Sequence, residues 1–98
     1  MNTSYCHIQT DRPQFYFNKL VVMNGNISRY TNGNFDLGSS SYRWRNIYTT
    51  DLQLSNEGKT NDVDGTWGDY TIQEGESDLF LINNRSGKKY KFNLTEVD

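Results

Sequence analysis

Residues 78–97 read DLFLINNRSGKKYKFNLTEV, and this stretch decides the fold. Two arms rich in apolar and aromatic residues flank NNRSG, whose residue types favour a tight turn. In the second arm Tyr90, Phe92 and Leu94 alternate with polar residues, as in a strand with one buried and one solvated face. The first arm is apolar at each of residues 79–82, which is typical of a strand between two layers or at a subunit interface. The stretch therefore predicts an antiparallel β-hairpin.

Upstream of the hairpin, the pattern predicts two further strands separated by a polar loop. One strand covers residues 66–74, around Trp67 and Tyr70. The other begins at Ile47 and runs to residue 54, with alternate side chains on opposite faces. Residues 56–65 between them are polar and rich in Asp, Asn and Gly, which favours a loop.

The N-terminal third of the sequence is also expected to be β-rich. Asn24-Gly25 is a strong signal for a two-residue hairpin turn, whereas Pro13 interrupts a central ladder because it lacks an N–H. Four short strands are expected, over residues 5–10, 14–18, 20–23 and 27–31. We therefore expect a single module over residues 1–98. Its parts are N-terminal strands and a hairpin (1–34), a serine-rich turn plus strand (35–55), and an acidic loop with the C-terminal hairpin (56–98).

Composition supports an all-β class with a thin core. Alanine is absent, so helix is expected to be limited to one turn over residues 40–45, where a serine hydroxyl can cap it. Leu, Ile, Val and Phe together account for 21 of the 98 residues, close to the level below which chains are disordered. Two Trp, seven Tyr and five Phe supply large units for burial and make disorder an unfavoured interpretation. Partners are expected to supply part of the burial.

Charge and cysteine usage exclude several functional classes. The net charge is −2, with five Lys or Arg against two Asp in residues 1–50 and five against ten acidic residues in 51–98. An isoelectric point near 5.3 argues against nucleic acid as a partner. Membrane insertion is not expected, because no apolar run approaches the length of a bilayer span. Cys6 is the single cysteine, so the fold does not depend on an internal disulfide.

Nothing in the sequence indicates catalysis, and no cofactor is expected. Cys6 and His7 are neighbours, so on a strand their side chains point to opposite faces and form no dyad. Residues 61–78 hold six carboxylates, but an EF-hand loop would need ligands where Thr60 and Thr71 stand. Loose divalent binding in that loop, or at three copies of His7 around an axis, remains a minor alternative to a solvated surface.

Five residues are candidates for contact with a receptor or glycan. Aromatic rings can stack on sugars, and a basic hairpin can meet an anionic polysaccharide, although lysines on a strand edge also prevent unwanted pairing. Most aromatic residues must be structural in a chain with so few aliphatic residues. The candidates are Tyr42, Trp67, Tyr70, Arg85 and Lys89.

Residues 35–54, FDLGSSSYRWRNIYTTDLQL, resemble a segment that recurs in the tail fibres and tailspikes of tailed bacteriophages. The shared pattern is Leu-Gly, serines, an aromatic-Arg-Trp triplet and Ile-Tyr. The residues that carry it here are Leu37, Gly38, Ser39, Trp44, Ile47 and Tyr48. Residues 8–19 and 68–97 also look like fibre sequence, especially that of phages of marine bacteria and cyanobacteria. Trp44 is expected to be the structural centre of the motif, as a clamp between the turn and the strand that follows.

The resemblance implies an all-β module that interlocks as a parallel homotrimer, at the tip of a fibre or as a connector. It implies a virion structural protein, made in the host cytoplasm, that contacts other tail or fibre proteins and supports attachment to the host. In many such fibres the serine-rich segment precedes a self-cleaving chaperone domain. Here it leads to the Lys-rich hairpin instead, so self-cleavage is not carried over.

Two functions from different classes compete with a passive structural role. One is an adhesin whose loops bind a host glycan or an outer-membrane protein, which is compatible with a fibre tip. The other is a monomeric carbohydrate-binding β-sandwich, which needs no partner copies. The oligomeric state separates the sandwich from both fibre interpretations.

Overall fold

The computed structural model describes residues 6–28 and 30–98, which form two units, Met1–Tyr30 and Thr31–Asp98. The described part of the first unit contains no strand, so the four strands expected in this region are not formed there. Residues 5 and 29 of those expected strands lie outside the described residues. The chain bends at Asn24-Gly25, but no ladder flanks the bend. A strand needs a partner for its N–H and C=O groups, and the described residues of this unit offer none.

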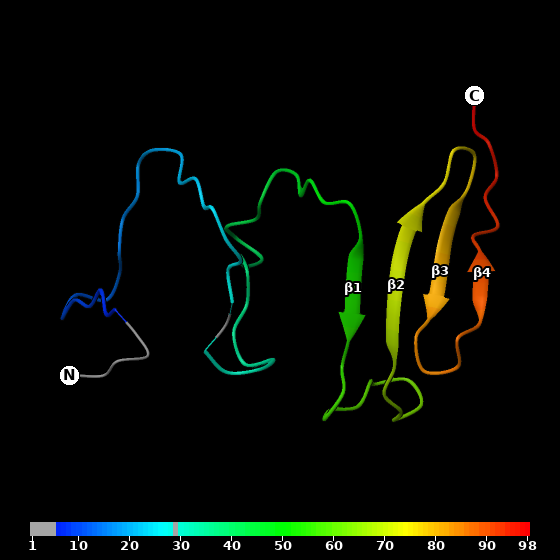
Figure 1. The fold of residues 1–98 in the computed structure, drawn as a ribbon, viewed down its shortest axis with the longest axis horizontal. Helices are drawn as coiled ribbons and strands as arrows, with labels where there is room; N and C mark the ends of the chain where they lie inside the picture. Colours follow the sequence, from blue (N-terminus) through cyan, green and yellow to red (C-terminus); the bar gives the residue numbers. More distant parts are fainter. Residues whose placement is uncertain (1–5, 29) are drawn as a thin grey trace. The chain divides into compact units, whose positions relative to one another are not determined.

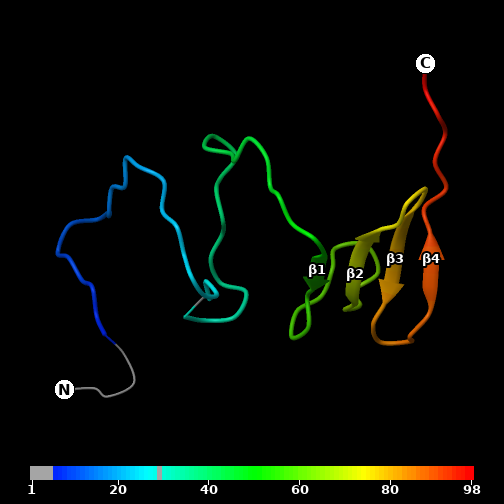
Figure 2. The same cartoon turned by 45° about the horizontal axis from the view of Figure 1, so that its top comes forward.

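The second unit contains a four-stranded antiparallel sheet with the strands in sequence order (Figures 1 and 2). Its strands are β1 (Leu52–Ser55), β2 (Asp69–Glu74), β3 (Leu79–Asn83) and β4 (Lys89–Lys91). The expected C-terminal hairpin is confirmed as β3 and β4. The strands expected upstream are confirmed as β1 and β2, both shorter than the pattern predicted. The all-β class is therefore correct, because the described residues contain four strands and no helix.

The register gives the sheet one apolar and one mainly polar face. Leu52 pairs with Ile72, Ile72 with Leu81 and Leu81 with Tyr90, so these side chains form a row on one face. Leu54 and Tyr70 pair on the same face. We call this surface the apolar face; its members are Leu52, Leu54, Tyr70, Ile72, Leu79, Leu81 and Tyr90.

Hydrogen bonds on the polar face hold three segments together. Thr71 Oγ1 donates to Gln53 Oε1 of β1 at 2.7 Å and accepts from Asn84 Nδ2 at 3.0 Å. Thr71 is 6% exposed, and it is the only buried side chain among the described residues. A polar group therefore occupies the best shielded position of the sheet, and it is satisfied there.

No hydrophobic side chain is buried in residues 6–28 and 30–98. Leu52 and Leu54 of the apolar face remain 44% and 45% exposed. β3 carries apolar side chains on both faces, as the sequence predicted, because Phe80 and Ile82 point away from Leu79 and Leu81. Within Thr31–Asp98 the sheet has a face suited to a core but no second layer against it.

β4 is an edge strand, and lysines flank its central tyrosine. Lys89 and Lys91 pair with Ile82 and Phe80, on the polar face. An unpaired strand edge invites pairing with other chains, and lysines at such an edge reduce this tendency. Lys89 and Lys91 therefore have a structural explanation that requires no ligand.

The serine-rich segment forms a tight reversal, and the helical turn expected over residues 40–45 is wrong. Ser39 N–H donates to Tyr42 O at 3.1 Å, and Tyr42 N–H donates to Ser39 Oγ at 3.2 Å. The backbone bond runs from the earlier N–H to the later carbonyl, opposite to the direction in an α-helix, so the turn cannot propagate as one. Gly38 has φ 84°, and a Cβ there would lie 3.5 Å from Trp44 Cδ1. Trp44 thus packs over the reversal while remaining 63% exposed.

No helix that could cross a lipid bilayer occurs in the described residues.

The β3–β4 turn closes at Gly87, whose φ of 77° lies in the left-handed region. Gly87 N–H donates to Asn83 O at 2.8 Å, and a Cβ on Gly87 would meet no atom within 4 Å. Substitution at Gly87 therefore tests backbone conformation without a steric clash.

We expect Gly87→Ala to destabilise the sheet by about 1–2 kcal/mol, because an L residue is disfavoured at positive φ. The melting temperature should fall by roughly 4–8 °C per kcal/mol. Gly25→Ala is the matched control, because Gly25 also has open space around it but no positive φ. Equal melting temperatures for the two variants, measured by circular dichroism, would contradict the assigned turn.

Candidate ligand-binding site

An arginine stacks on a tryptophan at the end of the sheet where β2 begins and β3 ends. The guanidinium carbon of Arg85 lies 3.7 Å from the centroid of the Trp67 ring. Arg85 Nη1 also donates to the backbone oxygen of Trp67 at 2.9 Å. A cation over an aromatic face is attracted by the quadrupole of the ring, and the hydrogen bond fixes the orientation of the guanidinium.

The turn after β3 positions Arg85 through Asn83. Asn83 Oδ1 accepts from Arg85 N–H at 3.0 Å and from Ser86 N–H at 3.3 Å. An Asn side chain that bonds backbone N–H groups two and three residues ahead is a common way to build such a turn. The sequence NNRSG thus fixes the backbone of Arg85, while Trp67 fixes its side chain.

Tyr70 lies beside Gly68 and Asn83, at the same end of the sheet. A Cβ on Gly68 would approach Tyr70 Cε2 to 2.8 Å, so the tyrosine ring rests over a position that only glycine leaves open. Asn83 Nδ2 donates to the Tyr70 hydroxyl at 3.4 Å. Gly68 N–H donates to Asn56 Oδ1 at 2.8 Å, which ties the strand entry to the loop after β1.

These side chains surround an open hollow of about 480 Å³, within the range of small-molecule sites. Trp67, Tyr70 and Asn83 are half-buried, whereas Thr66, Arg85 and Ser86 are exposed. We call this the Trp67–Arg85 site; its lining residues are Thr66, Trp67, Gly68, Tyr70, Asn83, Arg85 and Ser86. Arg85 forms no salt bridge with any described residue. The site therefore offers hydroxyl groups and a cation held by a ring and a carbonyl.

The structure brings three of the five sequence-predicted contact residues together, because Trp67, Tyr70 and Arg85 line one hollow. Lys89 lies on the polar face of β4, away from the face that carries Tyr70. Tyr42 belongs to the serine-rich reversal and is 84% exposed. These two residues do not belong to the Trp67–Arg85 site.

No pattern in the sequence marks Asn83, Ser86, Gly68 or Thr66 as part of a site. The turn signal in NNRSG was recognised, but it gave no reason to join the turn to Trp67, 18 residues before Arg85. The pairing of Tyr70 with Asn83 in the β2–β3 register is what brings the two segments to one end of the sheet. Only strand register carries that information.

The acidic loop between β1 and β2 is organised by its own hydrogen bonds. Asp64 Oδ1 accepts from Thr66 Oγ1 at 2.7 Å, from Asn61 Nδ2 at 2.8 Å and from Thr66 N–H at 3.1 Å. Hydrogen bonds from the side chains of Thr66 and then Asn61 hold the pKa of Asp64 below its ordinary value of 3.8. The described residues contain no group of three or more His, Cys, Asp or Glu placed to hold a metal ion.

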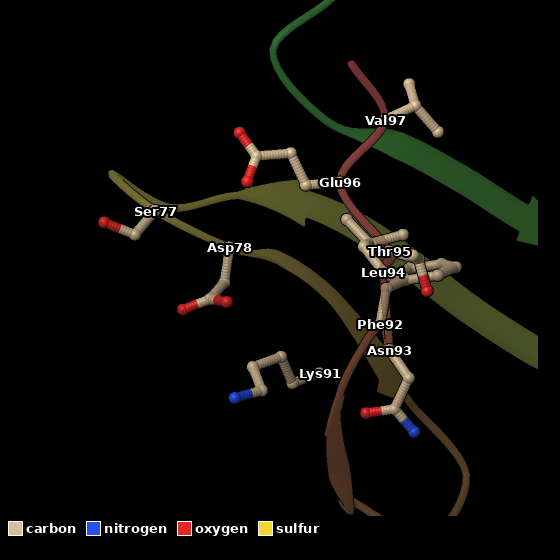
Figure 3. A pocket seen from close by; sticks show the side chains of 9 residues that line it. All are labelled: Ser77, Asp78, Lys91, Phe92, Asn93, Leu94, Thr95, Glu96 and Val97. Carbon is tan, nitrogen blue, oxygen red and sulfur yellow. The ribbon is translucent and has the colours of Figure 1, made fainter.

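A second, larger hollow of about 610 Å³ lies between the β2–β3 turn and the C-terminal segment. Figure 3 shows Asp78 and Lys91 on one side of it and Leu94 and Glu96 along the C-terminal segment. No hydrogen bond between the described residues joins the side chains that line it. Its charged groups are not held in place, unlike Arg85, so it is the weaker candidate.

Comparisons of the chain with protein families, with curated proteins and with solved structures found no match.

The lowered pKa of Asp64 predicts a pH dependence of the acidic loop. A carboxyl group whose pKa is lower in the folded state stabilises that state above the unfolded pKa, near 3.8, and this contribution is lost as pH falls through the folded value. An NMR titration of the Asp64 carboxyl should have its midpoint below 3.8. Thr66→Val removes the hydroxyl donor and should raise the midpoint, and no change in this variant would contradict the hydrogen-bond assignment.

Proposed function

We propose that the chain is a non-enzymatic structural module of a bacteriophage tail fibre, either a distal tip or a connector, that supports attachment to the host surface. The proposal places it in the virion after synthesis in the host cytoplasm. Its partners are copies of itself and other tail or fibre proteins. The resemblance of residues 35–54 to fibre segments is its basis in sequence.

The single observation that carries the proposal is that no described hydrophobic side chain is buried within the chain. Burial of apolar surface is the main favourable term in folding. Apolar side chains that are left exposed in this way gain stability when other chains cover them.

Copies of the same chain are the occupants we propose for the apolar face. Leu52, Leu54 and Tyr90 of the apolar face are 44%, 45% and 48% exposed, and every copy of the chain carries the same surface. Closed symmetry lets each copy cover the same apolar surface of a neighbour. The number three comes from the resemblance to fibre proteins, in which strands of parallel chains interlock about a threefold axis.

The serine-rich motif supports the same proposal. Leu37, Ile47 and Tyr48 are 77%, 70% and 92% exposed, so these apolar side chains of the motif are not buried within their own unit. Trp44 contacts the reversal at Gly38 and leaves most of its ring uncovered. Large exposed apolar residues of this kind mark contact surfaces.

An adhesin role is compatible with the proposal, since the Trp67–Arg85 site lies among turns at one end of the sheet. A host glycan or an outer-membrane protein would then be a partner. The monomeric carbohydrate-binding β-sandwich is the alternative. It receives less support, because the described residues form one sheet and a sandwich needs two.

We expect the purified chain to be a trimer in multi-angle light scattering at micromolar concentration. Leu54→Lys should prevent assembly, because it places a charge on the apolar face. Ser55→Lys is the matched control, since its side chain lies on the opposite face of the same strand. A folded wild-type monomer, or a trimer unchanged by Leu54→Lys, would contradict the proposed interface.

Trp44→Ala tests the serine-rich motif. Truncating a buried Trp costs about 3–5 kcal/mol, and this loss applies to Trp44 only when another copy covers it, because the ring is 63% exposed in one chain. We expect Trp44→Ala to abolish soluble assembly and Arg43→Ala to leave it nearly intact. A Trp44→Ala trimer of unchanged melting temperature that no longer binds host cells would instead make Trp44 a receptor contact.

A further inference from the structure

The Trp67–Arg85 site has features that select one class of ligand. Arg85 is held by the Trp67 ring at 3.7 Å and by the Trp67 carbonyl at 2.9 Å, so its guanidinium has a defined orientation without a ligand. A guanidinium carries several N–H donors in one plane, and only Nη1 is engaged with a described residue. The remaining donors form an edge that matches two oxygens of a carboxylate or phosphate.

The stacking of Arg85 on Trp67 also reduces the open ring face that is available to a neutral sugar. Neutral sugars bind aromatic residues by placing C–H groups on an open ring face. Arg85 already occupies one face of Trp67, so the pair presents a cation rather than a bare ring on that side. The site therefore favours an anionic group over an uncharged ring.

The charge balance around the site favours a single anionic group over bulk polyanion binding. Residues 51–98 carry ten acidic residues against five basic ones, which repels polyanions in general. Arg85 forms no salt bridge with the described carboxylates despite this excess. A fixed, unneutralised cation in an acidic chain is a specific anion contact rather than part of a basic patch.

Neighbouring groups fit the rest of a saccharide. Tyr70 and Ser86 line the same hollow as Arg85, and their hydroxyls accept but do not donate hydrogen bonds among the described residues, whereas the Thr66 hydroxyl already donates to Asp64. The volume of the hollow, about 480 Å³, admits a sugar residue. Hydroxyl groups can donate to or accept from the hydroxyls of a sugar.

We propose that the Trp67–Arg85 site binds a saccharide that carries an oxyanion, with Arg85 as the anion contact and Trp67 as the residue that positions Arg85. This proposal names a class of ligand for the attachment function proposed above. Only the biological role of the sugar binding rests on that function. A uronic acid and a phosphorylated sugar share this chemistry, and the experiment separates them.

The test uses the full-length chain titrated with glucuronate, glucose 6-phosphate or glucose, while NMR follows the indole N–H signals of its two tryptophans. We expect the Trp67 signal to shift with an anionic sugar and the Trp44 signal to remain as an internal reference. Whichever anionic sugar binds identifies the source of the oxyanion. Binding of neither anionic sugar, or equal binding of glucose, would overturn the proposal.

Variants assign the residue roles. Arg85→Ala should weaken binding about tenfold or more, and Arg85→Lys should restore it only in part, because an ammonium lacks the planar pair of donors. Lys89→Ala is the matched control, since it removes the same charge from a residue outside the site. Unchanged binding by a folded Arg85→Ala protein would refute the assignment.

Trp67→Phe tests the positioning role, because phenylalanine keeps an aromatic ring but provides a weaker cation–π partner. We expect weaker binding of the anionic sugar by this variant, with the strand content unchanged in circular dichroism. Affinity equal to that of the wild type would show that Trp67 does not position Arg85.

Light scattering on the same samples separates the two proposals. A chain that binds the anionic sugar as a monomer retains the ligand assignment and loses the trimeric fibre role. A trimer that binds none of the three sugars retains the fibre role and loses the ligand assignment.

Discussion

The hydrogen bonds of Thr71 are the constraint on which the sheet depends. Its hydroxyl donates to Gln53 of β1 and accepts from Asn84 after β3, so one side chain links three segments across the polar face. Because Thr71 is the only buried side chain among the described residues, polar bonds rather than an apolar core hold the strands in register. The apolar face on the other side of the sheet has no buried hydrophobic side chain within Thr31–Asp98.

The same turn that completes this network also builds the Trp67–Arg85 site. Asn84 bonds the backbone and side chain of Asp69 as well as Thr71, which fastens the β3–β4 turn to the start of β2. Asn83 then orders the backbone of Arg85. A site built on bonds that the sheet already requires is fixed before any ligand arrives, which reduces the entropy lost on binding.

The hairpin and the sides of its strands could be predicted from sequence, because alternation and turn residues act over a few positions. The N-terminal strands could not, since Asn24-Gly25 favours a turn but supplies no partner ladder. Ser39 capped Tyr42 N–H as expected of a helix start, yet the backbone bond between the two residues has the reverse direction. Trp67 and Arg85 were identified separately, and only the β2–β3 register shows that they meet.

The strand order β1-β2-β3-β4 has a kinetic consequence. Each strand pairs only with its neighbours in sequence, so the contacts of the described sheet are mainly local, and such low contact order favours rapid folding. The proposed covering of the apolar face by other chains would, in contrast, be an encounter between molecules whose rate depends on concentration. If copies assemble as proposed, the sheet forms on each chain first and assembly follows more slowly, with the lysines of β4 protecting the open edge during the interval.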